Sequence, residues 1–416
     1  MKIKLSELKA NILLLAYLAM LISKLLVYLE EGAVKGRIFD ILSWGLLLIC
    51  IFLYTRDISI KHFDSTSLVL IVGILAWMVW AYFYGAMFSI LNEFVPRFFL
   101  QSLPFYLDIL VFSNIVINSN LTGKFIKINL FTIGAFLFWR YCINFDSIDF
   151  IRTIGNFWSS NQSVRYRNAY GLYHANATGM LCYTYLVLFV LDTCYKGSYE
   201  KTHKLVKNFF YSIECVLLVI VFVMLLSTGS RNSLISALLF PVLFLTIRYF
   251  SRIHTIERHV QVAVGIILVA LLAIRLNFSS FLVQSNRLSN FSNLNLLSKY
   301  DKWITGLGIS DSGNFISGVL PLLGTTYLDN FYLWVLLTTG IIGCILLLIP
   351  VGYFTVSMVS KSLRETTFFA SVTAALLVAI FSAFFETNLI YPTFISSMIN
   401  WIIFISVCSA TASTDS

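Results

Sequence analysis

Charged residues are scarce in this sequence. Asp, Glu, Lys and Arg together make up 12% of the 416 residues, whereas a soluble domain carries about 25%. Apolar stretches recur from residue 11 to residue 411, and no soluble domain-sized segment separates them. Because crossing the hydrocarbon core of a bilayer takes roughly 20 consecutive apolar residues, the sequence predicts an all-α polytopic membrane protein. An ordinary soluble fold is excluded.

Cysteine pairs with metal-binding or redox spacing are also missing. The seven cysteines lie inside or at the ends of apolar runs, and none forms a C-x-x-C pair. A free cysteine in such surroundings behaves as a small apolar side chain. We therefore expect inert packing residues, with neither a metal site nor a disulfide framework.

Acidic residues are fewer than basic ones, which gives a formal net charge of +9. In a soluble protein this excess would suggest nucleic acid as a partner. In a membrane protein, basic connectors stay in the cytoplasm and attract anionic lipid. We therefore expect membrane lipid as a partner, and no nucleic acid.

Twelve apolar stretches set the predicted topology of one polytopic domain, residues 1–416. They are joined alternately by short basic connectors and by longer, more polar ones. Placing the N-terminus inside puts most Lys- and Arg-rich connectors in the cytoplasm. Both termini are then cytoplasmic in a multi-pass plasma-membrane protein. The expected spans are 11–29, 38–54, 67–89, 98–117, 128–145, 172–193, 208–228, 232–249, 260–280, 329–353, 367–385 and 391–410.

Two segments assigned to the outer face are longer than the other connectors, residues 146–171 and residues 281–328. The second joins the ninth and tenth spans and includes a turn-rich stretch from Gly306 to Gly313. Long ordered loops usually have a function. The Leu, Ile, Phe and Val content of this loop favours a folded, partly helical cap over a disordered linker.

Arginines occur on the outer face, where the positive-inside rule predicts few. Because arginine is a bidentate donor to phosphate and carboxylate groups, the set favours an anionic, membrane-bound substrate. The alternative is that some of them bind lipid headgroups or pair with nearby aspartates. The residues at or near the outer face are Arg165, Arg167, Arg231, Arg275 and Arg287.

Arg231 has the most informative position of this set. It follows Thr228-Gly229-Ser230, where two spans meet in a very tight turn. The glycine permits a sharp reversal of the backbone, and nearby hydroxyls and amides could complete an anion nest. A charge at this position would stay near the membrane surface, where a lipid diphosphate lies.

Two further segments at the outer face contain polar side chains suited to catalysis or binding. One runs from Tyr170 through His174 and Asn176 and opens the sixth span. The other is Asp329-Asn330, at the start of the tenth span. Asp329 is either a helix N-cap together with Asn330 or a general base for a sugar hydroxyl. His174 is either structural or part of the site.

Ionisable residues within the spans form a separate group. Asp108 falls in the middle of a span, and Lys24 and Glu214 also lie inside apolar runs. Such groups are costly in lipid and are therefore candidates for a function. We expect Asp108 to face the interior of the bundle, and Lys24 and Glu214 to snorkel or to form pairs.

Three elements together resemble the O-antigen ligase and polymerase superfamily, which includes oligosaccharide repeat-unit polymerases of the Wzy type. They are the Thr228–Arg231 turn, the Gly171–Asn176 segment, and the long outer loop leading into Asp329-Asn330 with Gly340 and Gly343. The ligase branch usually has a His-Asn pair where this chain has Asp329-Asn330. The resemblance therefore favours a polymerase of capsule, exopolysaccharide or O-antigen repeat units over a ligase.

The resemblance implies a metal-independent inverting glycosyltransferase, without a cofactor, that uses polyprenyl-diphosphate-linked oligosaccharides. A chain-length regulator and a flippase would be its partner proteins. Arg231 with Arg165 or Arg167 would bind the diphosphate, and Arg287 would be a further anion contact. Asp329 or His174 would orient or deprotonate the acceptor hydroxyl. The rest of the expected substrate-binding set is Tyr170, Asn176 and Asn330.

A transporter of lipid-linked oligosaccharide is the alternative from a different functional class. Transporters of this size usually have two related halves with interrupted spans at matching positions. Residues 1–200 and 201–416 show no convincing match, and a transporter needs no large outer loop. The sequence therefore favours the enzyme over the transporter, and a polymerase over a glycan ligase.

Overall fold

The computed structural model describes ten stretches of the chain, and all the regular elements within them are helices. The stretches are residues 5–29, 32–54, 60–88, 96–155, 167–199, 204–252, 289–308, 329–363, 365–392 and 394–412. The α-helices are α1 (Leu5–Val27), α2 (Gly32–Tyr54), α3 (Ser65–Phe88), α4 (Pro96–Asn118), α5 (Thr122–Asn144), α6 (Ser147–Gly155), α7 (Ala175–Tyr199), α8 (Lys204–Ser227), α9 (Arg231–Arg252), α12 (Leu294–Lys299), α14 (Phe331–Ser362), α15 (Thr367–Ser382) and α16 (Ile395–Ala412). Two short 3-10 helices are η1 (Ile60–His62) and η3 (Ser289–Asn293).

Six of these helices are long and apolar enough to cross a membrane, which confirms the prediction of a multi-pass helical membrane protein. They contain the candidate spans Leu8–Val27, Ser65–Tyr84, Thr122–Asn144, Ala175–Lys196, Arg231–Phe250 and Phe331–Ser362. Helices suit this environment because each satisfies its own backbone hydrogen bonds. The expected ninth span, 260–280, lies outside the described residues, and the total of twelve spans stays a prediction.

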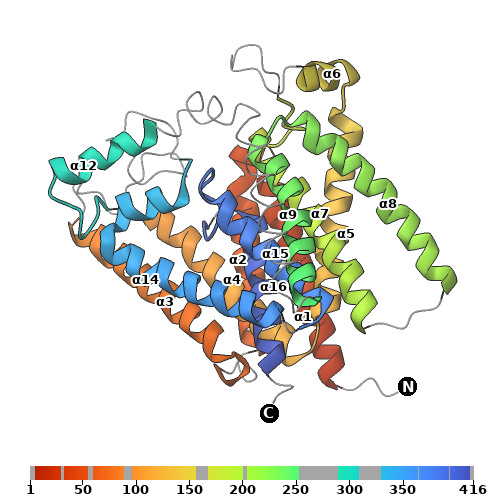
Figure 1. Cartoon of the computed structure of the whole chain (residues 1–416), viewed down its shortest axis with the longest axis horizontal. Helices are drawn as coiled ribbons and strands as arrows, with labels where there is room; N and C mark the ends of the chain where they lie inside the picture. The colour runs from red at the N-terminus through yellow and green to blue at the C-terminus, as the bar shows by residue number, and fades with distance from the viewer. Residues whose placement is uncertain are drawn as a thin grey trace.

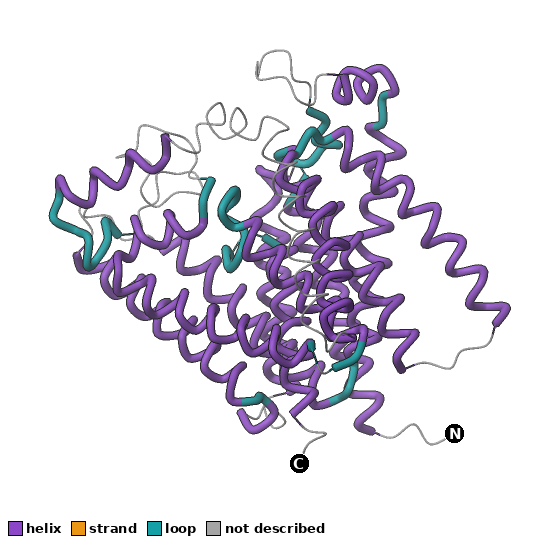
Figure 2. The backbone as a smooth tube through the Cα atoms, viewed as in Figure 1, coloured by secondary structure: helices purple, strands orange, loops and turns teal. Residues whose placement is uncertain are grey.

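The helices form a bundle with two distinct ends (Figure 1). The first turn of α1 and the last turn of α16 lie at one end, at the bottom of the view, whereas α6 and α12 lie at the other. We call this second end the α6 end. α3 packs along α14 on one side, while α5, α7 and α8 pack together on the other. Figure 2 shows the loops at the α6 end that join these helices.

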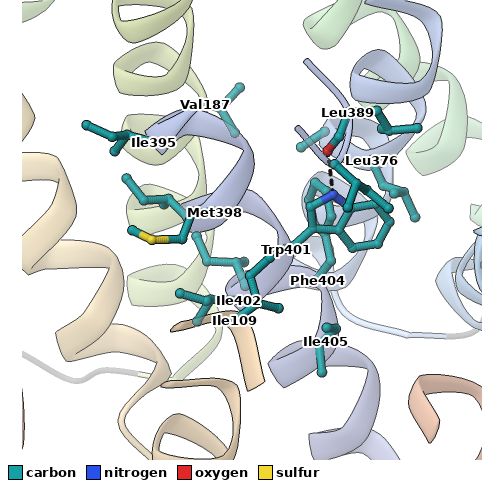
Figure 3. Close-up of a cluster of buried hydrophobic side chains, with 14 of the residues drawn as sticks. Ile109, Val187, Leu376, Leu389, Ile395, Met398, Trp401, Ile402, Phe404 and Ile405 are labelled. Carbon is teal, nitrogen blue, oxygen red and sulfur yellow. Dashed lines mark hydrogen bonds between the residues drawn. The ribbon is translucent and has the colours of Figure 1, made fainter. Parts of the chain in front are cut away.

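The centre of the bundle is packed around α16. Trp401 of α16 is buried and lies beside Leu376 of α15, while Ile109 of α4 and Val187 of α7 belong to the same buried cluster (Figure 3). Its indole Nε1 donates a hydrogen bond of 2.6 Å to the carbonyl oxygen of Leu389. Leu389 lies in the buried, non-helical connector between α15 and α16. Such backbone is tolerated inside a membrane bundle where protein groups satisfy it.

α14 is interrupted at Gly340, which the sequence did not indicate. Gly340 has φ 66° and ψ −166°, a backbone conformation essentially confined to glycine. Residues 303–308 supply hydrogen-bond partners to the interrupted helix. Four backbone bonds join them: Leu307 N to Leu337 O (2.8 Å), Gly308 N to Thr338 O (2.9 Å), Ile341 N to Trp303 O (2.9 Å) and Ile342 N to Ile304 O (3.2 Å).

The interruption in α14 also requires close approach of two backbones. A Cβ atom on Gly306 would lie 2.5 Å from the backbone nitrogen of Gly340, so both glycines are needed at the crossing. α3 supports the junction: Trp80 Nε1 donates to Thr339 O at 3.0 Å, and the Tyr84 hydroxyl donates to Gly306 O at 3.1 Å. The described part of the 281–328 loop is therefore fixed to α14 and α3.

The three ionisable residues singled out within the spans, Lys24, Asp108 and Glu214, are paired. The Lys24 ammonium lies 3.0 Å from the carboxylate of Asp108, which is fully buried. Lys196 lies 3.4 Å from Glu214 and also pairs with Asp192. The predictions that Asp108 faces inward and that Lys24 and Glu214 form pairs are thus confirmed. Removing one partner of such a pair would leave an uncompensated buried charge.

Candidate functional site

Two of the segments singled out in the sequence meet at the α6 end, in the turn between α8 and α9. This turn consists of Thr228, Gly229 and Ser230, and Gly229 has φ 57°. Arg167 Nε donates to the carbonyl oxygen of Thr228 at 3.4 Å. The backbone amide of Asn168 donates a hydrogen bond of 3.1 Å to the carbonyl oxygen of Ser227. The segment that contains Arg167 therefore lies directly against the turn that precedes Arg231.

Arg167 is also the first member of a chain of three polar side chains. Its Nη2 donates a short hydrogen bond to Asn176 Oδ1, and Asn176 Nδ2 donates to Glu386 Oε1 at 2.9 Å. Arg167 and Asn176 are half-buried, and Glu386 is buried. A guanidinium and a carboxylate from distant parts of the sequence are thus held in one cluster by a shared amide. We call Arg167, Asn176 and Glu386 the Arg-Asn-Glu cluster.

His174 lies beside this cluster and caps the N-terminus of α7. Its Nδ1 accepts a hydrogen bond of 3.1 Å from the backbone amide of Asn176. Burial and the nearby Arg167 guanidinium lower the pKa of His174 below its usual value of 6.5. Both effects favour the neutral imidazole. Since Nδ1 is the acceptor, Nε2 bears the proton of the neutral imidazole.

Tyr170 has a different position from the one expected of a substrate-binding residue. Its side chain is fully buried, and its hydroxyl is hydrogen-bonded to Ser227. Arg140 Nε, at the end of α5, donates to the Tyr170 carbonyl at 2.8 Å. Tyr170 therefore anchors the 167–176 segment to α5 and α8, and its contact with substrate stays a prediction.

Asp329 and Asn330 stand just before α14. Asn330 is the N-cap of that helix, since its Oδ1 accepts from the Leu333 amide at 2.9 Å. Phe331 N donates to Ala383 O at 2.9 Å, which joins this segment to the connector that contains Glu386. The capping alternative is confirmed for Asn330, whereas Asp329 is half-buried and its role as a base stays a prediction.

The remaining arginines are placed in part. Arg231 is the first residue of α9 and is half-buried. Its neighbour Asn232 is buried and donates to Ser382 Oγ of α15 at 2.8 Å, so the start of α9 is held against α15. Arg165 and Arg287, expected to bind anions, lie outside the described residues.

Glu386 and Arg140 are the residues of this region that the sequence analysis missed. Glu386 is the one carboxylate in the apolar connector from Phe384 to Tyr391, a signal similar to the one that singled out Asp329. Arg140 lies inside an expected span, near its outer end, and was not counted with the outer arginines. The positions of Glu386 and Arg140 near the other polar side chains can be recognised only in the folded structure, where the helix ends lie together.

Within the described residues, no group of three or more His, Cys, Asp and Glu side chains could hold a metal ion. The polar groups assembled at the α6 end instead provide guanidinium donors, an imidazole donor and carboxylate acceptors. Comparison with protein-family models and with curated proteins finds no match to this chain.

Proposed function

We propose that this protein is a polysaccharide polymerase that joins polyprenyl-diphosphate-linked oligosaccharide repeat units at the outer leaflet of the plasma membrane. The observation on which the proposal depends is the Arg-Asn-Glu cluster beside the turn that leads into Arg231. The cluster combines a guanidinium, which would bind the leaving diphosphate, with a carboxylate, which would accept the proton of the attacking hydroxyl. The resemblance of the same segments to the ligase and polymerase superfamily supports the proposal.

The proposed reaction is a substitution at the anomeric carbon of the growing chain. A hydroxyl oxygen of the acceptor repeat unit forms the new glycosidic bond, and the bond to the polyprenyl diphosphate breaks. The hydroxyl proton passes to a carboxylate, and the diphosphate leaves with the bonding electrons. Attack from the side opposite the leaving group inverts the anomeric configuration.

The arginines would stabilise the leaving group. Negative charge builds on the diphosphate as its bond to the sugar breaks, and fixed donors that meet this charge lower the barrier. We assign this role to Arg231 and Arg167, with Arg165 and Arg287 as further anion contacts. Arg167 suits it because the hydrogen bonds to Thr228 and Asn176 fix the plane of its guanidinium.

The carboxylates would act on the acceptor. Glu386 joins Asp329 as a general base for the hydroxyl proton, since its hydrogen bond from Asn176 orients one carboxylate oxygen. His174 is better suited to donate a hydrogen bond through Nε2, because its Nδ1 is occupied by the Asn176 amide. General-base catalysis contributes about 10²–10⁴-fold.

Glycan length in cells tests this proposal. A strain lacking the gene is complemented with wild type, Arg231→Ala or the control Arg248→Ala, which removes a charge from the other end of α9. We expect long polymer with wild type and Arg248→Ala, and single repeat units on lipid with the deletion and Arg231→Ala. Long polymer that accumulates on lipid in the deletion would indicate a ligase. Repeat units confined to the inner leaflet would indicate a flippase.

A further inference from the structure

The short helix α6 exposes an apolar face. Ile148, Ile151 and Ile154 recur at every third position and therefore share one side of the helix, where they are 59%, 69% and 46% exposed. The opposite side faces the protein, with Thr153 fully buried. α6 packs against α8. A helix on the surface of a soluble protein turns its apolar side toward the protein. α6 instead turns its apolar side away from the protein.

The residues before α6 mark where a bilayer would end. α5 contains the candidate span Thr122–Asn144, and α6 begins at Ser147, immediately after it. Trp139 and Ile143 in the last turns of α5 are exposed. Tryptophan is enriched at membrane interfaces, where its ring lies at the level of the headgroups. The isoleucine face of α6 thus follows the exposed apolar side chains of α5 directly along the chain.

A basic residue lies at the margin of this apolar face. The Arg152 side chain is 66% exposed and lies 4.0 Å from Asp149. Basic side chains at the margin of an apolar helical face are typical of helices that lie in the membrane surface. A guanidinium is also well suited to the phosphate of a lipid headgroup.

We propose that α6 is an interfacial helix that lies in the surface of the bilayer. Its three isoleucines enter the boundary between headgroups and acyl chains, and Arg152 meets the phosphates. Lipid is the occupant that fits, because α6 begins just after a candidate membrane span whose last turns expose Trp139 and Ile143. The lipid contact itself does not depend on the proposed reaction.

The interfacial position of α6 fixes the depth of the polar groups at this end of the bundle. A series of aromatic contacts runs from the helix toward the Arg-Asn-Glu cluster. The ring centroids of Phe150 and Phe145 are 6.1 Å apart, those of Phe145 and Tyr141 are 4.6 Å apart, and those of Tyr141 and Tyr170 are 6.5 Å apart. Tyr170 belongs to the segment that contains Arg167. The cluster would accordingly lie near the headgroups, at the depth of a lipid-linked diphosphate.

Photocrosslinking of the full-length protein in phosphatidylcholine–phosphatidylglycerol nanodiscs tests the proposal. p-Benzoylphenylalanine replaces Ile151 in one variant and Phe150, whose half-buried ring contacts Phe145, in a matched control. We expect several-fold more phospholipid adduct at position 151 than at position 150, where crosslinks within the chain dominate. Crosslinks from position 151 to another segment of the chain or to a second copy would overturn the proposal. Absence of any adduct at 151, with an efficient crosslink at 150, would also overturn it, since it would place the face in water.

Discussion

Arg167 is held on two sides, by Thr228 and by Asn176, so its charge acts at a defined place. One group that senses this charge is His174, whose pKa is lowered by burial and by Arg167. At pH values between 6.5 and the lowered pKa, an unfolded chain binds a proton at this histidine and the folded chain does not. The contribution of His174 to stability therefore decreases as the pH falls below 6.5.

The pKa of His174 gives a prediction for Arg167 variants. Arg167→Gln removes the nearby cation, so the pKa of His174 should rise toward 6.5 but stay below it, because the burial remains. Arg167→Lys keeps the charge and should leave the pKa lowered. NMR titration of protein labelled at histidine, with the signal assigned through His174→Gln, measures this. Equal pKa values in wild type and Arg167→Gln would contradict the assigned cause.

For individual residues of the candidate site, the sequence indicated which polar side chains lie together better than it indicated what each one contacts. The proximity of Arg167 and Asn176 to the turn before Arg231 could be expected, since all were assigned to helix ends on the same face. Glu386 was missed because a connector of a few residues gives no sign that it folds back among the helices. The burial of Tyr170 could not be predicted, because it depends on contacts with α5 and α8.

The interruption of α14 shows how one element depends on another far away in the chain. Residues 303–308 provide the hydrogen-bond partners that the helix lacks around Gly340, and Gly306 lies against Gly340 at the crossing. The first part of α14, which follows Asp329, is consequently fixed to the described part of the long loop. A change at this crossing should affect both elements together.

Replacing Gly340 with alanine tests the importance of this crossing. Alanine is strained at φ 66° and ψ −166°, and its Cβ atom would collide with the Ile304 carbonyl oxygen. We expect a loss of about 1–3 kcal/mol in the free energy of unfolding from the backbone strain alone, seen as a lower midpoint in thermal unfolding. Gly352→Ala is the matched control in the same helix, because a Cβ there would meet nothing within 4 Å. Equal midpoints for the two variants would contradict the interpretation.

The long elements were predictable and the short ones were not. Runs of apolar residues predict α1, α3, α5 and α7 because the thickness of a bilayer imposes their length. α6 has nine residues, too few to be noticed by a count of apolar runs. The break at Gly340 could not be expected, since glycine is common in membrane helices and only contact with residues 303–308 determines its conformation.

In the whole molecule, the first turn of α1 and the last turn of α16 lie at one end of the bundle, and α6 and α12 lie at the other (Figure 1). α6 belongs to the predicted outer segment 146–171 and α12 to the predicted outer segment 281–328, and the placement of the two whole segments stays a prediction. This arrangement does not by itself assign either face to the cytoplasm. That assignment depends on the distribution of Lys and Arg.

Reporter fusions test the orientation of the whole chain. We expect a fluorescent protein fused after residue 416 to be fluorescent, as in the cytoplasm, and alkaline phosphatase fused after Lys302 to be active, as outside it. The opposite pair of results would place the 281–328 loop in the cytoplasm. Both the polymerase and the ligase hypotheses would then fail, since their substrates lie at the outer leaflet.

The most direct test of the account is reconstitution of the purified protein with polyprenyl-diphosphate-linked repeat units from the organism that makes the glycan. We predict that wild type converts these units into a ladder of longer glycans and releases polyprenyl diphosphate. Glu386→Gln should slow this conversion about 10²–10⁴-fold, whereas the control Glu365→Gln, at the opposite end of the bundle, should not. Repeat units that stay single in the presence of folded wild-type protein, or that only change leaflets, would contradict the proposal that this protein is a polymerase.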